Sequence, residues 1–130
     1  MSDPDFTEPP KKPKRRNDEA KLQRECMKYL RKIGWIATRV NAGTFRVGDR
    51  RISGAETGTS DILACSRTGK FCAIEVKTPT GKVSEVQEHY MARVAECGGS
   101  VAVVRSMLDL EAFCEVVDGE KFLGKKLSEG

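Results

Sequence analysis

The sequence is poor in histidine and in aromatic residues. It contains one histidine, His89, one tryptophan, two tyrosines and five phenylalanines among 130 residues. A single histidine excludes the His-rich zinc sites, in which several imidazole groups hold one ion. His89 itself lies in a polar stretch with helical character, which favours a surface position.

Paired cysteines and long apolar runs are also missing. The five cysteines are odd in number and show no C-x-x-C spacing, which favours reduced thiols in the core of a cytoplasmic protein. No apolar run approaches the ~20 residues of a membrane span, and no signal-peptide pattern opens the chain. We therefore expect a soluble protein without membrane contact, and 130 residues suffice for one domain with its own core.

The two ends of the chain are polar. Residues 1–17 hold four of the five prolines and a basic run over residues 11–16, which predicts a disordered tail. Residues 118–130 predict a second polar tail, so the folded domain is expected over residues 18–117. The net charge of +4 is modest and suggests a polyanionic partner.

The most informative stretch covers residues 58–77. It reads as two short strands joined by a tight turn. If residues 67–69 form the turn, Asp61 lies directly opposite Glu75, and opposed residues share one face of a sheet. Because side chains alternate along a strand, Lys77 lies on the face of Glu75. Both faces of the hairpin are otherwise apolar, so two carboxylates and an ammonium group at one end of it need a chemical explanation.

Two carboxylates held together and partly desolvated repel each other, and one of them then raises its pKa. A divalent cation removes the repulsion, and oxygen ligands suit Mg²⁺ or Mn²⁺. Such an ion lowers the pKa of a bound water and offsets charge on a phosphate. Lys77 would then orient the nucleophile or contact the phosphate. The alternative is a solvated salt bridge at the end of a sheet.

Two further residues could join this group. Asn17 can cap a helix that ends at Gly34, and Glu19 in its first turn points towards the apolar face. Glu19 is therefore either a third acidic group near the metal or a residue that suits the helix dipole. Gln87 lies three residues after Ser84 and completes a capping box, so a catalytic role would be an addition to a structural one.

A basic segment covers residues 39–51, at the end of an expected first strand over residues 35–40. It contains four arginines against one aspartate, and glycines keep it loop-like. A basic, mobile loop beside an acidic metal site fits a phosphate-rich substrate. The alternative is an ordinary basic loop.

The remaining pattern predicts a helix over residues 84–97, a strand over residues 100–105 and a last helix capped by Ser106. The element order is therefore α-β-β-β-α-β with a further C-terminal helix. We expect an α/β fold in which helices flank a central mixed sheet.

Five short motifs follow one another along the chain: Glu19-x-x-x-Gln23, Arg39-Val-Asn41-x-Gly43, Gly58-x-Ser-Asp61, Ile74-Glu75-Val-Lys77 and Ser84-x-x-Gln87. In this order and spacing, residues 18–117 resemble the VRR-NUC family, especially its short stand-alone members from phages and bacteria. This family lies within the restriction-endonuclease-like superfamily, whose signature is PD-(D/E)XK. Ser60 departs from the wider superfamily, in which proline often precedes the aspartate, but Asp61 is kept.

The resemblance implies a site for Mg²⁺ or Mn²⁺. The metal ligands would be Asp61, Glu75 and the backbone carbonyl of Val76, and Glu19 would contribute directly or through water. The resemblance further implies that Lys77 assists the attacking water and that Gln87 helps to set the site.

The resemblance also implies hydrolysis of DNA phosphodiesters. Stand-alone members look like homodimers that cut branched DNA, Holliday junctions in particular, in a bacterial or phage-infected cell. A two-fold dimer would supply two active sites for the paired strands of a junction. The candidate DNA contacts are Arg39, Asn41, Arg46, Arg50 and Arg51.

Three other functions stay open at this point. The first is a nickase or flap endonuclease that acts on simpler DNA. The second is a non-catalytic DNA-binding module, although the complete set of Asp61, Glu75 and Lys77 argues against it. The third is a small interaction protein in which these residues form a surface ion pair.

Overall fold

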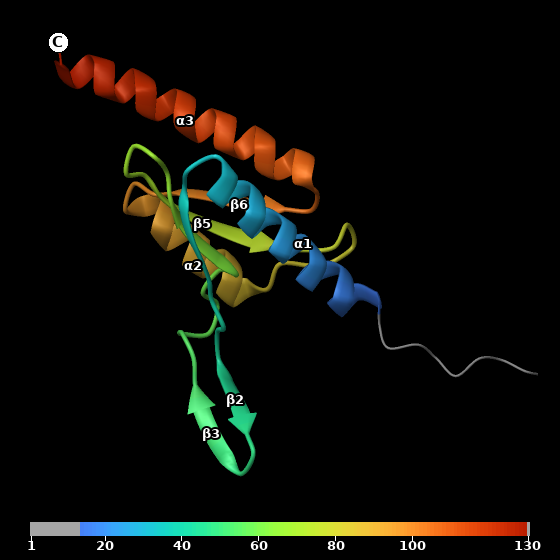
Figure 1. Cartoon of the computed structure of the whole chain (residues 1–130). Coiled ribbons are helices and arrows are strands. Elements are labelled where there is room, and N and C mark those ends of the chain that lie inside the picture. Colours follow the sequence, from blue (N-terminus) through green and yellow to red (C-terminus); the bar gives the residue numbers. More distant parts are fainter. Residues whose placement is uncertain (1–13, 130) are drawn as a thin grey trace, which may run out of the picture.

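A four-stranded mixed sheet forms the centre of the molecule (Figure 1). The computed structural model describes residues 14–129. The strand order is β1-β4-β5-β6; the first three strands pair antiparallel, and β6 runs parallel to β5. The strands are β1 (Ile36–Arg39), β4 (Ile62–Cys65), β5 (Phe71–Val76) and β6 (Ser100–Val104).

Three helices cover this sheet: α1 (Lys14–Lys32), α2 (Glu85–Glu96) and α3 (Met107–Glu129). Helices α1 and α3 contact each other and pack on one face, whereas α2 packs against β5 and β6 from the other side (Figure 1). The predicted α/β fold is therefore confirmed, including the central mixed sheet and the C-terminal helix.

The main core lies between the sheet and the pair α1 and α3. Alternate residues of β4 and β5 point into it, because side chains of a strand alternate between its two faces. Trp35 closes one end of this core, and its ring meets that of Phe113 edge-on with centroids 6.3 Å apart. The buried residues of this core on the two strands are Ile62, Ala64, Cys72, Ile74 and Val76.

The predicted register of the β4–β5 hairpin is confirmed. Ile62 lies opposite Ile74, and the Ser66 amide donates to the Lys70 carbonyl at 2.9 Å. Gly69 completes the turn at φ +92°, in the left-handed region that favours glycine.

The basic segment differs from the prediction, because it forms a second hairpin instead of a loop. Strands β2 (Thr44–Val47) and β3 (Arg50–Ser53) pair only with each other and form a separate two-stranded sheet. Figure 1 shows this hairpin projecting away from the body of the domain.

The ends of the fold also differ from the prediction. Helix α1 begins at Lys14, so Asn17 lies inside the helix and does not cap it. Helix α3 continues to Glu129, through residues expected to form only a polar tail. The rest of the expected N-terminal tail, residues 1–13, and residue 130 lie outside the described residues. Within the described part, no helix is long and apolar enough to span a membrane.

Candidate active site

Asp61 is held at the start of β4, where three strands meet. Its backbone carbonyl accepts a hydrogen bond from the Val40 amide at 2.8 Å. Its side-chain Oδ2 accepts one from the Val76 amide, also at 2.8 Å. The first bond ties Asp61 to the end of β1 and the second ties its carboxylate to β5, so the other carboxylate oxygen has a fixed direction.

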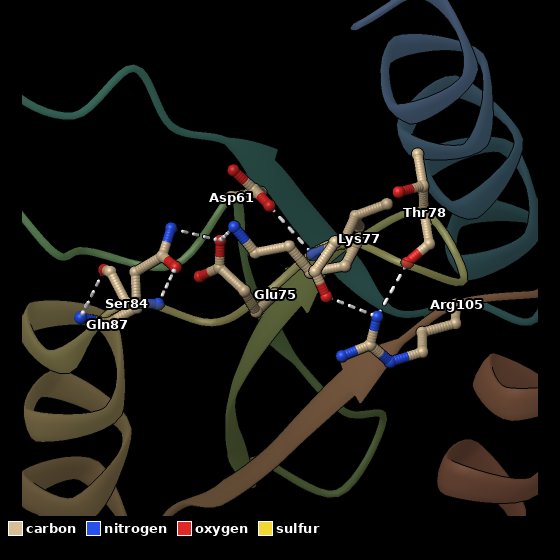
Figure 2. Close-up of polar contacts among 9 residues, drawn as sticks. Asp61, Glu75, Lys77, Thr78, Ser84, Gln87 and Arg105 are labelled. Atoms are coloured by element: carbon tan, nitrogen blue, oxygen red, sulfur yellow. Dashed lines mark hydrogen bonds and ion pairs between the residues drawn. The ribbon is translucent and has the colours of Figure 1, made fainter. Parts of the chain in front are cut away.

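Glu75 is a buried acid on the face of β5 that α2 covers; it is 1% exposed. Its Oε1 accepts a hydrogen bond from Gln87 Nε2 at 2.9 Å, and Lys77 Nζ lies 4.0 Å from the same oxygen. Its Oε2 is buried and has no hydrogen-bond partner among the described residues. Figure 2 shows the three side chains gathered beside Asp61.

The pKa of Glu75 is raised to about 8. Burial is the main cause, followed by the negative charge of the nearby Asp61 carboxyl; Glu19 adds a smaller contribution, and Lys77 opposes the shift. Without a cation, the pair therefore holds a proton near neutral pH, because the protonated carboxyl relieves both desolvation and repulsion.

These residues fit a divalent cation. The unpartnered Oε2 of Glu75 and the Asp61 carboxylate supply hard oxygen donors, which Mg²⁺ and Mn²⁺ prefer. Within residues 14–129, no group of three or more His, Cys, Asp and Glu side chains could hold a metal ion. The structure therefore brings two acidic side chains together, Asp61 and Glu75, and the negative charge of Glu19 acts on Glu75.

Because Glu75 is buried, we expect the metal-free protein to become less stable as the pH rises. The pKa of Glu75 is about 8 in the folded protein against an ordinary value of 4.5, so the folded chain keeps a proton that the unfolded chain loses between these values. Its contribution to the free energy of unfolding is complete below pH ~4.5 and is lost as the pH rises through about 8. We expect the melting temperature in chelator to fall by several degrees relative to Glu75→Gln over this interval. Parallel curves for the two proteins would contradict this assignment.

A cleft of about 660 Å³ opens beside the two acids. Asp61 and Gln87 lie in its wall, as does Asn41, one of the predicted DNA contacts. Arg39 reaches the same region, because its Nη2 donates to Gln23 Oε1 at 2.8 Å. The complete lining is Gln23, Val40, Asn41, Ala42, Gly58, Thr59, Asp61 and Gln87.

The other predicted DNA contacts do not line this cleft. Arg46 lies on β2, and Arg50 and Arg51 lie on β3, in the hairpin that projects from the body. The structure thus divides the candidate residues into a set at the cleft and a set on the hairpin.

Helix α2 places Gln87 against the acid. The predicted capping box is confirmed: Ser84 Oγ accepts from the Gln87 amide at 3.3 Å, and Gln87 Oε1 accepts from the Ser84 amide at 2.9 Å. Because its Nε2 donates to Glu75, the side chain of Gln87 uses one end to hold the helix terminus and the other to orient the acid.

Arg105, directly after the end of β6, supports the site, a role that the sequence did not predict. Its guanidinium donates to the carbonyl oxygens of Thr78 and Gly81, each at 2.7 Å, and so fastens the loop that follows Lys77 (Figure 2). Arg105 and its partners lie more than twenty residues apart in the sequence, so no local sequence pattern predicts these hydrogen bonds. Gln23 was found only as part of a motif, one helical turn after Glu19.

Comparison with known proteins agrees with this fold. A solved structure described as a VRR_NUC domain matches with a TM-score of 0.57 and 20% sequence identity, over 75% of this chain and 95% of that chain. At this identity the match shows the fold alone, and no curated protein matches the sequence. The family model of the VRR-NUC domain matches residues 13–108. The chain therefore belongs to the VRR-NUC family of nuclease-like PD-(D/E)XK domains.

Proposed function

We propose that this protein is a metal-dependent endonuclease that hydrolyses phosphodiesters in DNA. Membership of the VRR-NUC family supports a nuclease. The observation that carries the proposal is the buried carboxylate of Glu75, which has one unpartnered oxygen, the Asp61 carboxyl beside it and Lys77 Nζ 4.0 Å from its other oxygen. A surface ion pair would not need a buried acid with a pKa raised to about 8.

The proposed metal ligands are Asp61, Glu75 and the carbonyl of Val76, with Mg²⁺ or Mn²⁺ as the ion. Within a strand, the N–H and C=O groups of one residue point towards the same neighbour. Because the Val76 N–H meets Asp61, its carbonyl lies on the Asp61 side as well. Glu19 would contribute directly or through water. When bound, the ion supplies Lewis-acid stabilisation of charge on a phosphate and a lower pKa for a bound water.

The protein groups have separate roles in this proposal. Lys77, with its side chain only 14% exposed, orients the attacking water or the phosphate through its ammonium group. Gln87 fixes Oε1 of Glu75 and leaves Oε2 for the site. The Val76 amide fixes the rotamer of Asp61. Such prior positioning lowers the barrier because little reorganisation is left for the reaction itself.

Metal binding should stabilise the protein, and more so at pH 8 than at pH 6. At pH 6 the ion must displace the proton of the carboxyl pair, whereas near pH 8 about half of the molecules have already lost that proton. At ~100 times the dissociation constant, Mn²⁺ should raise the melting temperature by about 5–10 °C. Glu75→Gln should lose this response. A shift of equal size in the variant would place the binding site elsewhere.

We propose branched DNA, in particular the four-way Holliday junction, as the substrate of a homodimer. The proposal is supported by the likeness to stand-alone members of the family. In addition, a two-fold dimer would supply two active sites for the paired strands of a junction. The test compares cleavage of a four-way junction with that of linear, nicked and flapped duplexes, and measures the mass in solution by light scattering. Preferred cleavage of the nicked or flapped duplex by a monomer would favour a nickase or flap endonuclease instead.

The proposed DNA contacts are Arg39 and Asn41 at the cleft and three arginines on the hairpin. Asn41 lines the cleft beside Asp61, and the guanidinium of Arg39 is oriented there by Gln23. Residues in these positions would hold the phosphate backbone at the point of cleavage. The hairpin set is Arg46, Arg50 and Arg51.

A further inference from the structure

The β2–β3 hairpin places two arginines directly opposite each other. In its register, Thr44 pairs with Ser53, and Arg46 pairs with Arg51. Directly opposed residues of an antiparallel pair share one face, with Cβ atoms ~5 Å apart. Two positive charges therefore lie side by side at the centre of this hairpin.

This arrangement is unfavourable for the isolated hairpin. Like charges directly opposite each other destabilise an antiparallel pair, and a two-stranded hairpin without further packing is only marginally stable. Among the described residues, neither Arg46 nor Arg51 makes a side-chain ion pair or hydrogen bond, and both are exposed. The repulsion is thus not relieved within the described part of the chain, and an external anion would relieve it.

The two faces of the hairpin differ in character. The face of Arg46 and Arg51 also carries the hydroxyl groups of Thr44 and Ser53, and hydroxyl and guanidinium groups are the usual contacts to phosphate oxygens. The other face carries Arg50 and the exposed apolar side chains of Val47 and Ile52. The polar face therefore matches a sugar–phosphate backbone in both charge and hydrogen-bonding groups.

The base of the hairpin is tied to the active-site cleft. The Ala55 amide donates to the Asn41 carbonyl at 2.9 Å, and the Gly54 amide donates to the Gly43 carbonyl at 2.7 Å. A Cβ atom at Gly54 would collide with the carbonyl oxygen of Asn41, so this close pairing needs glycine. Since Asn41 and Ala42 line the cleft, the hairpin continues directly from the wall of the site.

The length of the hairpin sets its reach. The five residue steps from Asn41 to Arg46 span at most ~17 Å at ~3.3 Å per residue. At 3.4 Å per base pair, this corresponds to ~5 base pairs of duplex. The hairpin can therefore contact DNA well outside the cleft while its base stays beside the reacting phosphate.

We propose that the β2–β3 hairpin is an arm that contacts the backbone of a DNA duplex up to ~5 base pairs from the cleavage site, with Arg46 and Arg51 as a paired phosphate clamp. The proposal rests on the proposed nuclease function for the position of the cleavage site. The arm contributes to affinity and not to the chemical step, because its arginines lie outside the cleft.

The test is the double variant Arg46→Ala/Arg51→Ala, with binding of a 24-base-pair duplex measured by fluorescence anisotropy in EDTA at several salt concentrations. We expect affinity at ~100 mM salt to fall roughly tenfold or more, and the slope of log K against log salt to decrease by about 2, one per lost phosphate contact.

The matched control removes two exposed charges from α1, in Lys28→Ala/Arg31→Ala, and should change the salt slope less. An unchanged salt slope in the hairpin variant, or an equal loss of DNA affinity in both variants, would contradict the proposal that the hairpin contacts DNA. A change of mass in solution without loss of DNA affinity would also overturn it, because the hairpin would then be a contact between copies of the chain. Because binding is measured without metal, the experiment tests the role of the hairpin in DNA binding even if the wild-type protein cuts no DNA.

Discussion

Asp61→Asn and Glu75→Gln are each expected to reduce Mg²⁺-dependent DNA cleavage by at least about 10³-fold, because each removes one negative oxygen ligand from a two-carboxylate site. Both replacements keep the local hydrogen bonds. The oxygen of Asn at position 61 can accept from the Val76 amide, and that of Gln at position 75 can accept from Gln87. The fold and the affinity for DNA should therefore be retained. Single-turnover cleavage and anisotropy in EDTA measure the two effects separately.

The matched control is Glu56→Gln, which removes the same charge from an exposed position outside the cleft lining. It should cleave DNA within about twofold of wild type. Full activity of either site variant, or equal cleavage by the wild type in excess chelator, would contradict a metal-dependent reaction at Asp61 and Glu75.

Lys77→Met is expected to reduce cleavage by about 10²- to 10³-fold. The ammonium group lies 4.0 Å from Glu75 Oε1, and its charge lowers the pKa of Glu75. Its removal therefore has two consequences: the nucleophile or phosphate loses an orienting charge, and the metal must displace a more tightly held proton. The pH at which Mn²⁺ binding reaches half of its maximum should move upward in the variant.

Lys77→Arg separates these two consequences. The guanidinium keeps the positive charge near Glu75, so the pH dependence of Mn²⁺ binding should stay close to that of wild type. Its planar, larger head group does not reproduce the position of an ammonium, so cleavage should be only partly restored. Cleavage by Lys77→Met within about threefold of wild type would remove Lys77 from the proposed machinery.

In the absence of metal, the candidate site lowers the stability of the wild-type fold. Glu75 is desolvated, its Oε2 has no partner in the described part of the protein, and a second carboxyl lies beside it. An amide at either acidic position removes charge repulsion and can donate to an unpaired oxygen. Asp61→Asn and Glu75→Gln are therefore expected to melt at higher temperature than wild type in chelator, a trade-off typical of functional sites.

The sequence predicted the hairpin of β4 and β5 with its register because several local signals agreed. Two apolar runs flank a three-residue turn with Gly69, and a slip by one residue would move Ile62 and Ile74 out of the core. The capping box of Ser84 and Gln87 was equally local. The fold class followed from the order of such segments.

The β2–β3 hairpin was missed because its glycines and arginines suggested a loop. A better signal was present: Gly48-Asp49 is a two-residue connection, and the run before it, Phe45-Arg46-Val47, alternates apolar and basic residues. Its positive φ of +63° at Gly48 agrees with a tight hairpin turn. The exposure of both strands removed the apolar pattern on which strand prediction depends.

Other features could not be read from local patterns. The start of α1 at Lys14 was missed because Asn17 offers a plausible cap three residues later. The contacts of Arg105 with Thr78 and Gly81 join segments that are distant in sequence, and only the parallel pairing of β5 and β6 brings them together. The same holds for Gln23 and Arg39, whose hydrogen bond links α1 to β1.

The presence of a metal site at Asp61 and Glu75 can be tested directly with an anomalous difference map from a crystal soaked in Mn²⁺ above pH 8. We expect one strong peak between the carboxylates of Asp61 and Glu75, within coordination distance of the Val76 carbonyl, and no such peak in Glu75→Gln. A map without density at this position, in which the two side chains keep the same hydrogen bonds as in the absence of metal, would contradict the presence of this metal site.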